Sequence, residues 1–494
     1  MQSKREQIQA HSFMMSRLTA GMLLAEPDAP ENPLSRTTRG TFIGILIGCL
    51  LCAGALVLGM LRPGGNASWK SPGTLVVNKE TGARYLYAGG LLMPVRNYAS
   101  ARLIGGAELK TFSVGTASLE GTPIGPTVGI PGAPESVPTN GRLNDAPWQV
   151  CAVPEPTGPN QSGGRQTMRS TTVVAVDRAS GTRGLSTTEA LIVAGPDRET
   201  YVVWRGSRLK LDKKSGAAVS LGYGSVVPLP VSAAFLDTLA LGPVLSPKTP
   251  PGLGEAGPRL NGAPSKVGQV FQIRLPGSAP QYYLLKREGL VSVTDSEAAL
   301  ELGDATVREK SYEGRTTQAA ELDASSLKEH LAAGSEHAGP GSTLPASPPK
   351  AVTLPAESAV CAVVRPEARG PRVTVSLEAA GTLGRSVPKS ADVRPACHRV
   401  DHVIVPSGHG ALVRALGAGG SEVGNTTYLV SDTGAKYRVP TSAALTSLGY
   451  TPADVVALPS TLLNMLPTGM DLAPEAATGA ERPRTTALTC GVER

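Results

Sequence analysis

The sequence has few aromatic side chains and lacks the short motifs that mark several common enzyme classes. Phe, Trp and Tyr make up 4% of 494 residues, so hydrophobic cores must be built from Val, Leu, Ile and Ala. The absence of Gly-Lys-Ser/Thr excludes a Walker A phosphate loop, and neither G-x-S-x-G nor H-E-x-x-H occurs. The net charge of +7 is spread without a Lys/Arg block, which argues against a nucleic-acid partner.

Gly252, Gly254 and Gly257 form one G-x-G-x-x-G pattern, in PPGLGEAGP. No strand is expected before it and no helix after it, as a dinucleotide fingerprint would require. We interpret it as the composition of a linker, so no catalytic residue is assigned.

An apolar run extends from Thr41 to Met60 without a charge, an amide or a proline. A helix of that length spans roughly 30 Å, the hydrocarbon core of a bilayer. A cleaved signal peptide is the alternative, but its apolar core is shorter, about 7–15 residues, and lies nearer the N-terminus. We expect an uncleaved transmembrane helix at 41–61, with a cytoplasmic arm before it and a large extracytoplasmic body after it.

Two surfaces near the membrane are candidate contacts. Small residues recur every four positions in the apolar run, a spacing that lets another helix approach closely; they are Gly40, Gly44, Gly48 and Cys52. Residues 1–26 are expected to be helical, with Ser3 and Glu6 at capping-box spacing. This arm carries an apolar stripe that could dock on a partner or lie on the inner membrane surface, formed by Ile8, Met15, Leu18 and Met22.

An internal repeat organises the exterior. Three stretches start at Thr200, Gln281 and Thr427, and each ends at a Gly 22 residues later. Each has a β-rich run, a Gly-containing turn, a second run, and an Ala/Leu-rich helix closed by Gly. A looser fourth copy is expected from Thr74, with a longer loop. A unit this small buries little surface alone, so each copy should pack on a neighbour or on a central core.

The order of the repeats predicts a duplicated body. The run APWQVCAV, with Cys151, lies between the first two copies, and ESAVCAVV, with Cys361, lies between the last two. We expect an α+β region in which these strands pair in a central β-rich domain, with four small β-β-α repeat domains. The predicted parts are an arm at 1–40, the membrane helix at 41–61, repeat domains at 70–134, 198–260, 265–335 and 425–474, central halves at 145–197 and 355–424, and a tail at 475–494.

Four of the six cysteines lie outside the apolar run, and four cysteines allow three pairings. The duplication favours Cys151–Cys361, which leaves Cys397–Cys490 to hold the tail. Such bonds imply an oxidising compartment and so support an extracytoplasmic body. The alternatives are four free thiols in a reducing compartment, or a metal site with Cys397, His398 and His402, for which no second Cys/His group has ligand spacing.

The arm, the apolar run and the exterior together resemble the EccB family, a membrane component of type VII (ESX-type) secretion systems. The strings that carry the resemblance are QIQAHSFMMSRL, ETGARYLY, LLMPVRNYASARL, GIPGAP, WQVCA and TSLGYTPADVVALPSTLLNMLPTG. The resemblance implies a cytoplasmic N-terminus and an elongated body of a central β domain with four repeat domains. It also implies a disulfide at Cys151 and Cys361 and assembly with EccC, EccD and EccE. The segment with His398, His402 and His409 matches no family motif.

We therefore expect a structural subunit of the secretion membrane complex that self-associates, needs no cofactor, and helps to form the export channel and its extracytoplasmic vestibule. Some family members carry an ATPase label. The missing phosphate loop, and a body placed where ATP is scarce, argue against that activity here. The alternatives are an ATP-hydrolysing subunit of the same system, or a membrane-anchored protein whose repeated modules bind the cell wall.

Overall fold

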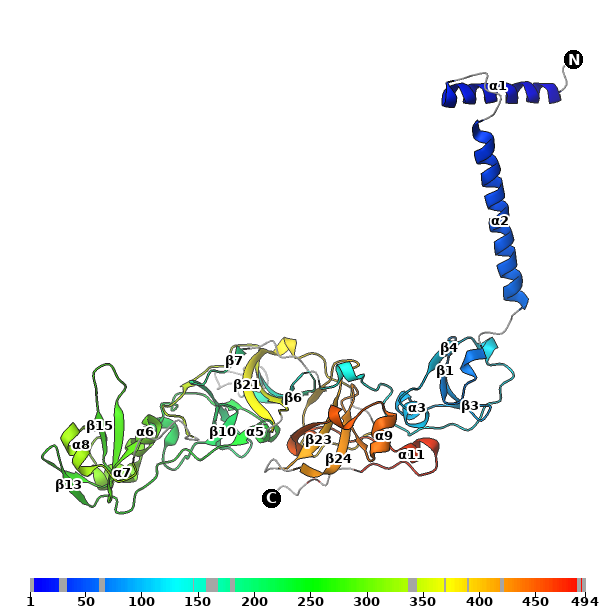
Figure 1. Ribbon diagram of the computed structural model, residues 1–494. Helices are drawn as coiled ribbons and strands as arrows, with labels where there is room; N and C mark the ends of the chain where they lie inside the picture. Colours follow the sequence, from blue (N-terminus) through cyan, green and yellow to red (C-terminus); the bar gives the residue numbers. More distant parts are fainter. Residues whose placement is uncertain are drawn as a thin grey trace, which may run out of the picture. The chain divides into compact units, whose positions relative to one another are not determined.

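The computed structural model describes residues 4–25, 33–61, 67–144, 146–156, 168–177, 183–335, 344–367, 370–388, 391–417, 422–486 and 490 (Figure 1). The chain divides into two compact units, one of Met1–Leu92 with Thr111–Ile124 and the other of Met93–Lys110 with Gly125–Arg494. Its architecture is one long apolar helix near the N-terminus and a strand-rich mixed α/β body.

Two helices open the first unit, α1 (Lys4–Leu24) and α2 (Pro33–Leu61). Within α2 the 22 residues Thr37–Leu58 have a mean hydropathy of 2.6 and are not buried by the described chain, so the helix is long and apolar enough to cross a membrane. It starts before the apolar run, at Pro33, and proline is compatible with the first position of a helix because it removes no intrahelical hydrogen bond there. The predicted cap at Ser3 lies outside the described residues.

The central sheet is built from two parts of the chain that are far apart in sequence. Its order is β22-β6-β5-β20-β21-β7, and all neighbours are antiparallel except β22 and β6. The strands are β5 (Trp148–Pro156), β6 (Met168–Ala175), β7 (Arg183–Gly184), β20 (Ser358–Arg365), β21 (Arg372–Ala379) and β22 (His402–Ile404). Because side chains alternate along a strand, Val150 and Val360 face one core while Cys151 and Cys361 face another.

Four small sheets accompany the central sheet. The first and second contain β1 (Thr74–Asn78), β2 (Arg84–Ala88), β3 (Leu91–Pro94) and β4 (Thr111–Val114), then β8 (Glu189–Ala194), β9 (Thr200–Trp204), β10 (Ser207–Lys210), β11 (Leu229–Pro230) and β12 (Ala240–Leu241). The third and fourth contain β15 (Val270–Ile273), β16 (Gln281–Lys286), β17 (Gly289–Val293) and β18 (Ala320–Glu321), then β23 (Ala411–Leu416), β24 (Glu422–Val430), β25 (Lys436–Val439) and β26 (Val456–Pro459). β19 (Lys350–Ala351) also pairs with β8.

The four small sheets share one topology. Each has three antiparallel strands in sequence order, and a later strand pairs in parallel with the first of them: β4 with β1, β11 with β8, β18 with β15, and β26 with β23. A helix follows the third strand in each case: α3 (Tyr98–Gly105), α4 (Ala217–Ser220), α6 (Asp295–Gly303) and α9 (Ser442–Ser447). The repeated unit therefore has one more strand before the helix than the expected β-β-α pattern.

In each small sheet, the strand that the β-β-α pattern did not include comes first in chain order. β8 and β23 precede residues 198 and 425, where the second and fourth repeat domains were expected to begin. In the first sheet the equivalent strand is β1, so the copy expected from Thr74 starts at Arg84 on β2. From Arg84 to Gly106 the separation is again 22 residues, and no longer loop is needed.

The run PPGLGEAGP, which was interpreted as linker composition, leads into a strand. β13 (Ala256–Leu260) pairs with β14 (Ala263–Lys266) in a separate hairpin. A Cβ added at Gly257 would lie 2.6 Å from Ser265 Oγ, and one at Gly254 would lie 3.0 Å from the Lys310 carbonyl oxygen. These glycines permit close packing of the chain.

Helices of the second unit pack on one another. α3 packs against α9 and α11 (Pro474–Thr478), and α4 packs against α6. The Arg102 guanidinium on α3 donates to the carbonyl of Leu448, which follows α9, at 2.9 Å. α5 (Ala233–Thr238) and α10 (Ser460–Leu463) pack on each other, and their residues Phe235 and Leu462 belong to the core on one face of the central sheet.

Candidate functional site

A buried disulfide joins the two halves of the central sheet. Cys151 on β5 lies directly opposite Cys361 on β20, with a Cα–Cα distance of 4.0 Å and an S–S distance of 2.06 Å. Both cysteines are fully buried, in a core with Val173 and Ile404. The bond connects residues separated by 210 positions, in the pairing expected from the duplication.

A second disulfide, Cys397–Cys490, connects the tail to the segment that precedes β22, with a Cα–Cα distance of 5.3 Å. It uses the sulfur that the alternative metal site would have needed. Among the residues that the structure describes, no group of three or more His, Cys, Asp or Glu could hold a metal ion. His402 instead begins β22, and the His398 backbone N–H donates to the Asn464 carbonyl at 3.0 Å.

His409 is part of a hydrogen-bonded chain with Asp177 and Arg142. Its Nδ1 lies 3.0 Å from Asp177 Oδ2, and its Nε2 lies 3.2 Å from an Arg142 guanidinium nitrogen. Since a guanidinium can only donate, Nε2 accepts and the ring proton is on Nδ1, where it points to the buried carboxylate. Asp177 also accepts from the Ala146 N–H. The network joins the segment after β6 to the turn before β23.

Lys436 is a buried cation at the start of β25. Its side chain is 2% exposed, and Nζ donates to the carbonyl oxygens of Leu463 and, at 3.0 Å, Leu466. Burial lowers the pKa of this amine to about 8. The Lys436 ammonium thus ties β25 to the end of α10.

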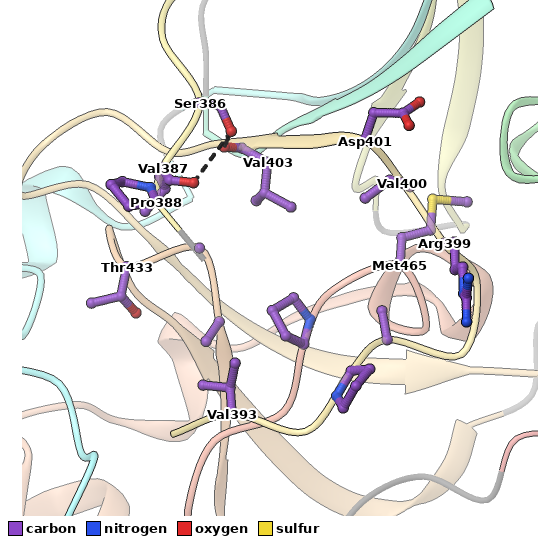
Figure 2. Close-up of a pocket in the computed structure, with 15 residues that line it drawn as sticks. Ser386, Val387, Pro388, Val393, Arg399, Val400, Asp401, Val403, Thr433 and Met465 are labelled. Atoms are coloured by element: carbon purple, nitrogen blue, oxygen red, sulfur yellow. Dashed lines mark hydrogen bonds between the residues drawn. The ribbon is translucent and has the colours of Figure 1, made fainter. Parts of the chain in front are cut away.

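A cavity of about 500 Å³ lies beside β22 and the turn that precedes β25 (Figure 2). Most of its lining is apolar, and it includes Val393, Val403 and Met465. Arg399 and Asp401 are its charged residues, and Asp401 Oδ2 accepts from the Thr172 N–H at 2.7 Å. The sequence does not reveal this cavity, because its lining residues come from separate segments and form no motif.

The membrane-proximal candidates are exposed in the structure. A Cβ added at Gly40, Gly44 or Gly48 would meet no atom of the described chain within 4 Å, and Cys52 is exposed. On α1 the four predicted docking residues are exposed: Ile8, Met15, Leu18 and Met22. Phe13 and Met14 are exposed too and point to other sides of the helix, so apolar side chains surround α1 instead of forming one stripe.

The combination of an arm, one apolar helix and a disulfide-linked strand-rich body matches a known family along almost the whole chain. Residues 1–482 match the family described as type VII secretion system ESX-1, transport TM domain B, or EccB. The chain belongs to this family. It is therefore a component of an ESX-type secretion membrane complex.

Curated relatives carry EccB names. The ESX-3 secretion system ATPase EccB3 of Mycolicibacterium smegmatis is 27% identical to this EccB-family chain over 465 residues, which cover 89% of this chain and 82% of that protein. The protein of the same name from Mycobacterium tuberculosis is 29% identical over 309 residues, which cover 60% of this chain and 55% of that protein.

Solved chains from ESX complexes share the fold. A chain of an intact ESX-5 inner membrane complex matches with a TM-score of 0.60 at 24% identity, covering 100% of this chain and 98% of that one. The EccB3 dimer from an ESX-3 core complex matches with a TM-score of 0.60 at 22% identity, covering 82% of this chain and 99% of the solved one.

Proposed function

We propose that this EccB-family chain is a structural subunit that helps to form the export channel of a type VII secretion complex and its extracytoplasmic vestibule. The observation that carries the proposal is the family match over residues 1–482, which includes the arm, the apolar helix and the body together. The titratable groups support it as well, because His409 and Lys436 tie strands and helices to one another.

The body of this subunit is a duplicated scaffold of four repeat domains around a central β domain. The common topology of the four small sheets supports this arrangement. Pairing of β5 with β20 places the β5–β6 and β20–β21 hairpins on either side of the Cys151–Cys361 bond. Helix contacts within the second unit, of α3 with α9 and of α4 with α6, also support this arrangement.

In the cell, α2 spans the membrane once, with the arm in the cytoplasm and the body outside. Two disulfides support this orientation, because such bonds persist in oxidising compartments. The exposed apolar side chains of α1 dock on partner subunits of the EccC, EccD and EccE types, and the body associates with a second copy. The EccB3 dimer of the related system supports self-association.

Gentle detergent extraction of the tagged full-length chain from its own bacterium tests this proposal. We expect EccC-, EccD- and EccE-type subunits and an untagged second copy to co-purify. A variant with Ile8, Met15 and Leu18 changed to Ser should lose partners while it stays in the membrane. A matched variant with Ser12, Ser16 and Thr19 changed to Ala is the control. If the other subunits stay assembled with one another but the wild-type chain purifies without them, that result would contradict a role as a subunit.

ATP hydrolysis is the second candidate, because the relatives' names contain the word ATPase. Titration of the purified full-length chain with labelled ATP distinguishes the two, with a known P-loop protein as the positive control. We expect no saturable binding in the micromolar range. Saturable binding that unlabelled ATP displaces would favour the enzymatic function.

A further inference from the structure

Two helices from different small sheets meet in the second unit. α4, of the second sheet, packs against α6, of the third. Their approach is close enough that a Cβ added at Gly303 would overlap Ser220. Leu300 of α6 enters the core of the second sheet, where Ala217 and Leu221 also lie. The junction therefore has an apolar centre.

Glu301, next to Leu300, is an unusual group to find in such a junction. Its side chain is 3% exposed. Oε1 accepts from the Lys248 backbone N–H at 2.5 Å, whereas Oε2 has no hydrogen-bond partner among the described residues. A buried carboxylate with one unsatisfied oxygen opposes packing, because its charge has left water without full compensation.

The surrounding charges do not neutralise Glu301. Lys248 Nζ is exposed and binds Glu297 at 3.1 Å. Asp304, after α6, adds a second nearby carboxyl, and its Oδ1 accepts from two backbone N–H groups of α7 (Ala305–Ser311). α4 and β15 contain no charged residue, and Lys286 of β16 lies 4.0 Å from Glu288.

These surroundings raise the pKa of Glu301 to about 6. Burial is the main cause, and the charges of Asp304 and Glu297 add to it, while the Lys248 N–H and ammonium act in the opposite direction. Because the pKa of Glu301 is higher in the closed junction than in the open one, closing favours binding of a proton to its carboxylate. Closure is then strongest below the ordinary pKa of 4.5 and weakens as the pH rises through about 6.

We propose that the contact between α4 and α6 is a proton-sensitive joint, in which protonation of Glu301 strengthens the packing of the third small sheet on the second. The joint adds a property to the body that does not depend on its proposed role in secretion. Acidification around the body would stiffen this part of it, and a return to neutral pH would loosen it.

Hydrogen exchange of the purified full-length chain at pH 5.0 and 7.5 tests the joint. After correction for intrinsic exchange, the opening equilibrium of amides in residues 295–303 should be about eightfold larger at pH 7.5 if opening returns the Glu301 pKa from about 6 to 4.5. Glu301→Gln has nearly the same shape without the charge, so we expect it to open equally at both pH values.

Glu309→Gln, on an exposed position of α7, is the matched control and should keep the wild-type pH response. Hydrogen exchange in the central sheet shows in the same experiment whether each variant is folded. The proposal is overturned if wild-type α6 opens equally at the two pH values, or if folded Glu301→Gln keeps the wild-type response.

Discussion

At the scale of residues, Lys436 makes the clearest prediction. Its pKa falls from 10.5 to about 8 on folding, so the unfolded chain binds more protons between these values and stability rises with pH across that interval. Chemical unfolding of the wild type and Lys436→Met at several pH values measures this. The free energy of unfolding of the wild type, relative to the variant, should rise by about 3 kcal/mol from pH 7 to 11.

The control for this prediction is Lys328→Met, because Lys328 is exposed on α8 (Ala324–His330). The free energy of unfolding of Lys328→Met should change with pH in the same way as that of the wild type. A constant difference between the wild type and Lys436→Met across the whole range would contradict the sign and size of the effect.

Sequence reasoning found some of these residues and missed others for physical reasons. The Cys151–Cys361 and Cys397–Cys490 pairs could be predicted because four cysteines permit few pairings and the duplication selects one of them. The burial of Lys436 and Glu301 could not be predicted. Charged residues in a strand or helix are normally solvated, and their burial depends on α10 and on the segment with Lys248, which only the tertiary fold brings near.

At the scale of elements, the small-residue stripe of α2 gives a prediction about packing. Gly44→Leu with Gly48→Leu should weaken co-purification of partner subunits severalfold while the helix still inserts, because the added side chains keep another helix at a distance. Ala53→Leu adds bulk on the other side of the same helix and should leave the complex intact. Equal recovery of partners with the double variant would mean that this face only contacts lipid.

The strands show what a sequence pattern does not determine, namely which strand begins each repeated unit. The stretches from Thr200 and Thr427 are strongly alike, and TLVV at Thr74 has the same β-rich composition, so the first copy was placed one strand too early. Strand propensity indicates that a segment is extended, but it does not determine where that strand lies in the sheet. The first strands β8, β15 and β23 differ in sequence, which hid them from the 22-residue period.

At the scale of the whole molecule, the two disulfides should respond differently to reductant. Cys151 and Cys361 are fully buried, whereas Cys490 is exposed and Cys397 only partly buried. A thiolate must reach a sulfur to attack it, so graded reductant on the native chain should open Cys397–Cys490 first. Alkylation and peptide mapping measure the order, and denatured protein is the control. Equal rates in the native chain would contradict the burial of the central bond.

Pairing of β5 with β20 also sets an order of events in biosynthesis. The two cysteines are 210 residues apart, and at roughly 5–20 residues per second a ribosome needs about 10–40 s to make the intervening chain. Throughout that interval β5 has an unpaired edge that includes Trp148 and Val150. An unpaired apolar edge is a site of aggregation. The first half of the body is therefore most prone to aggregate while the second half is still being made.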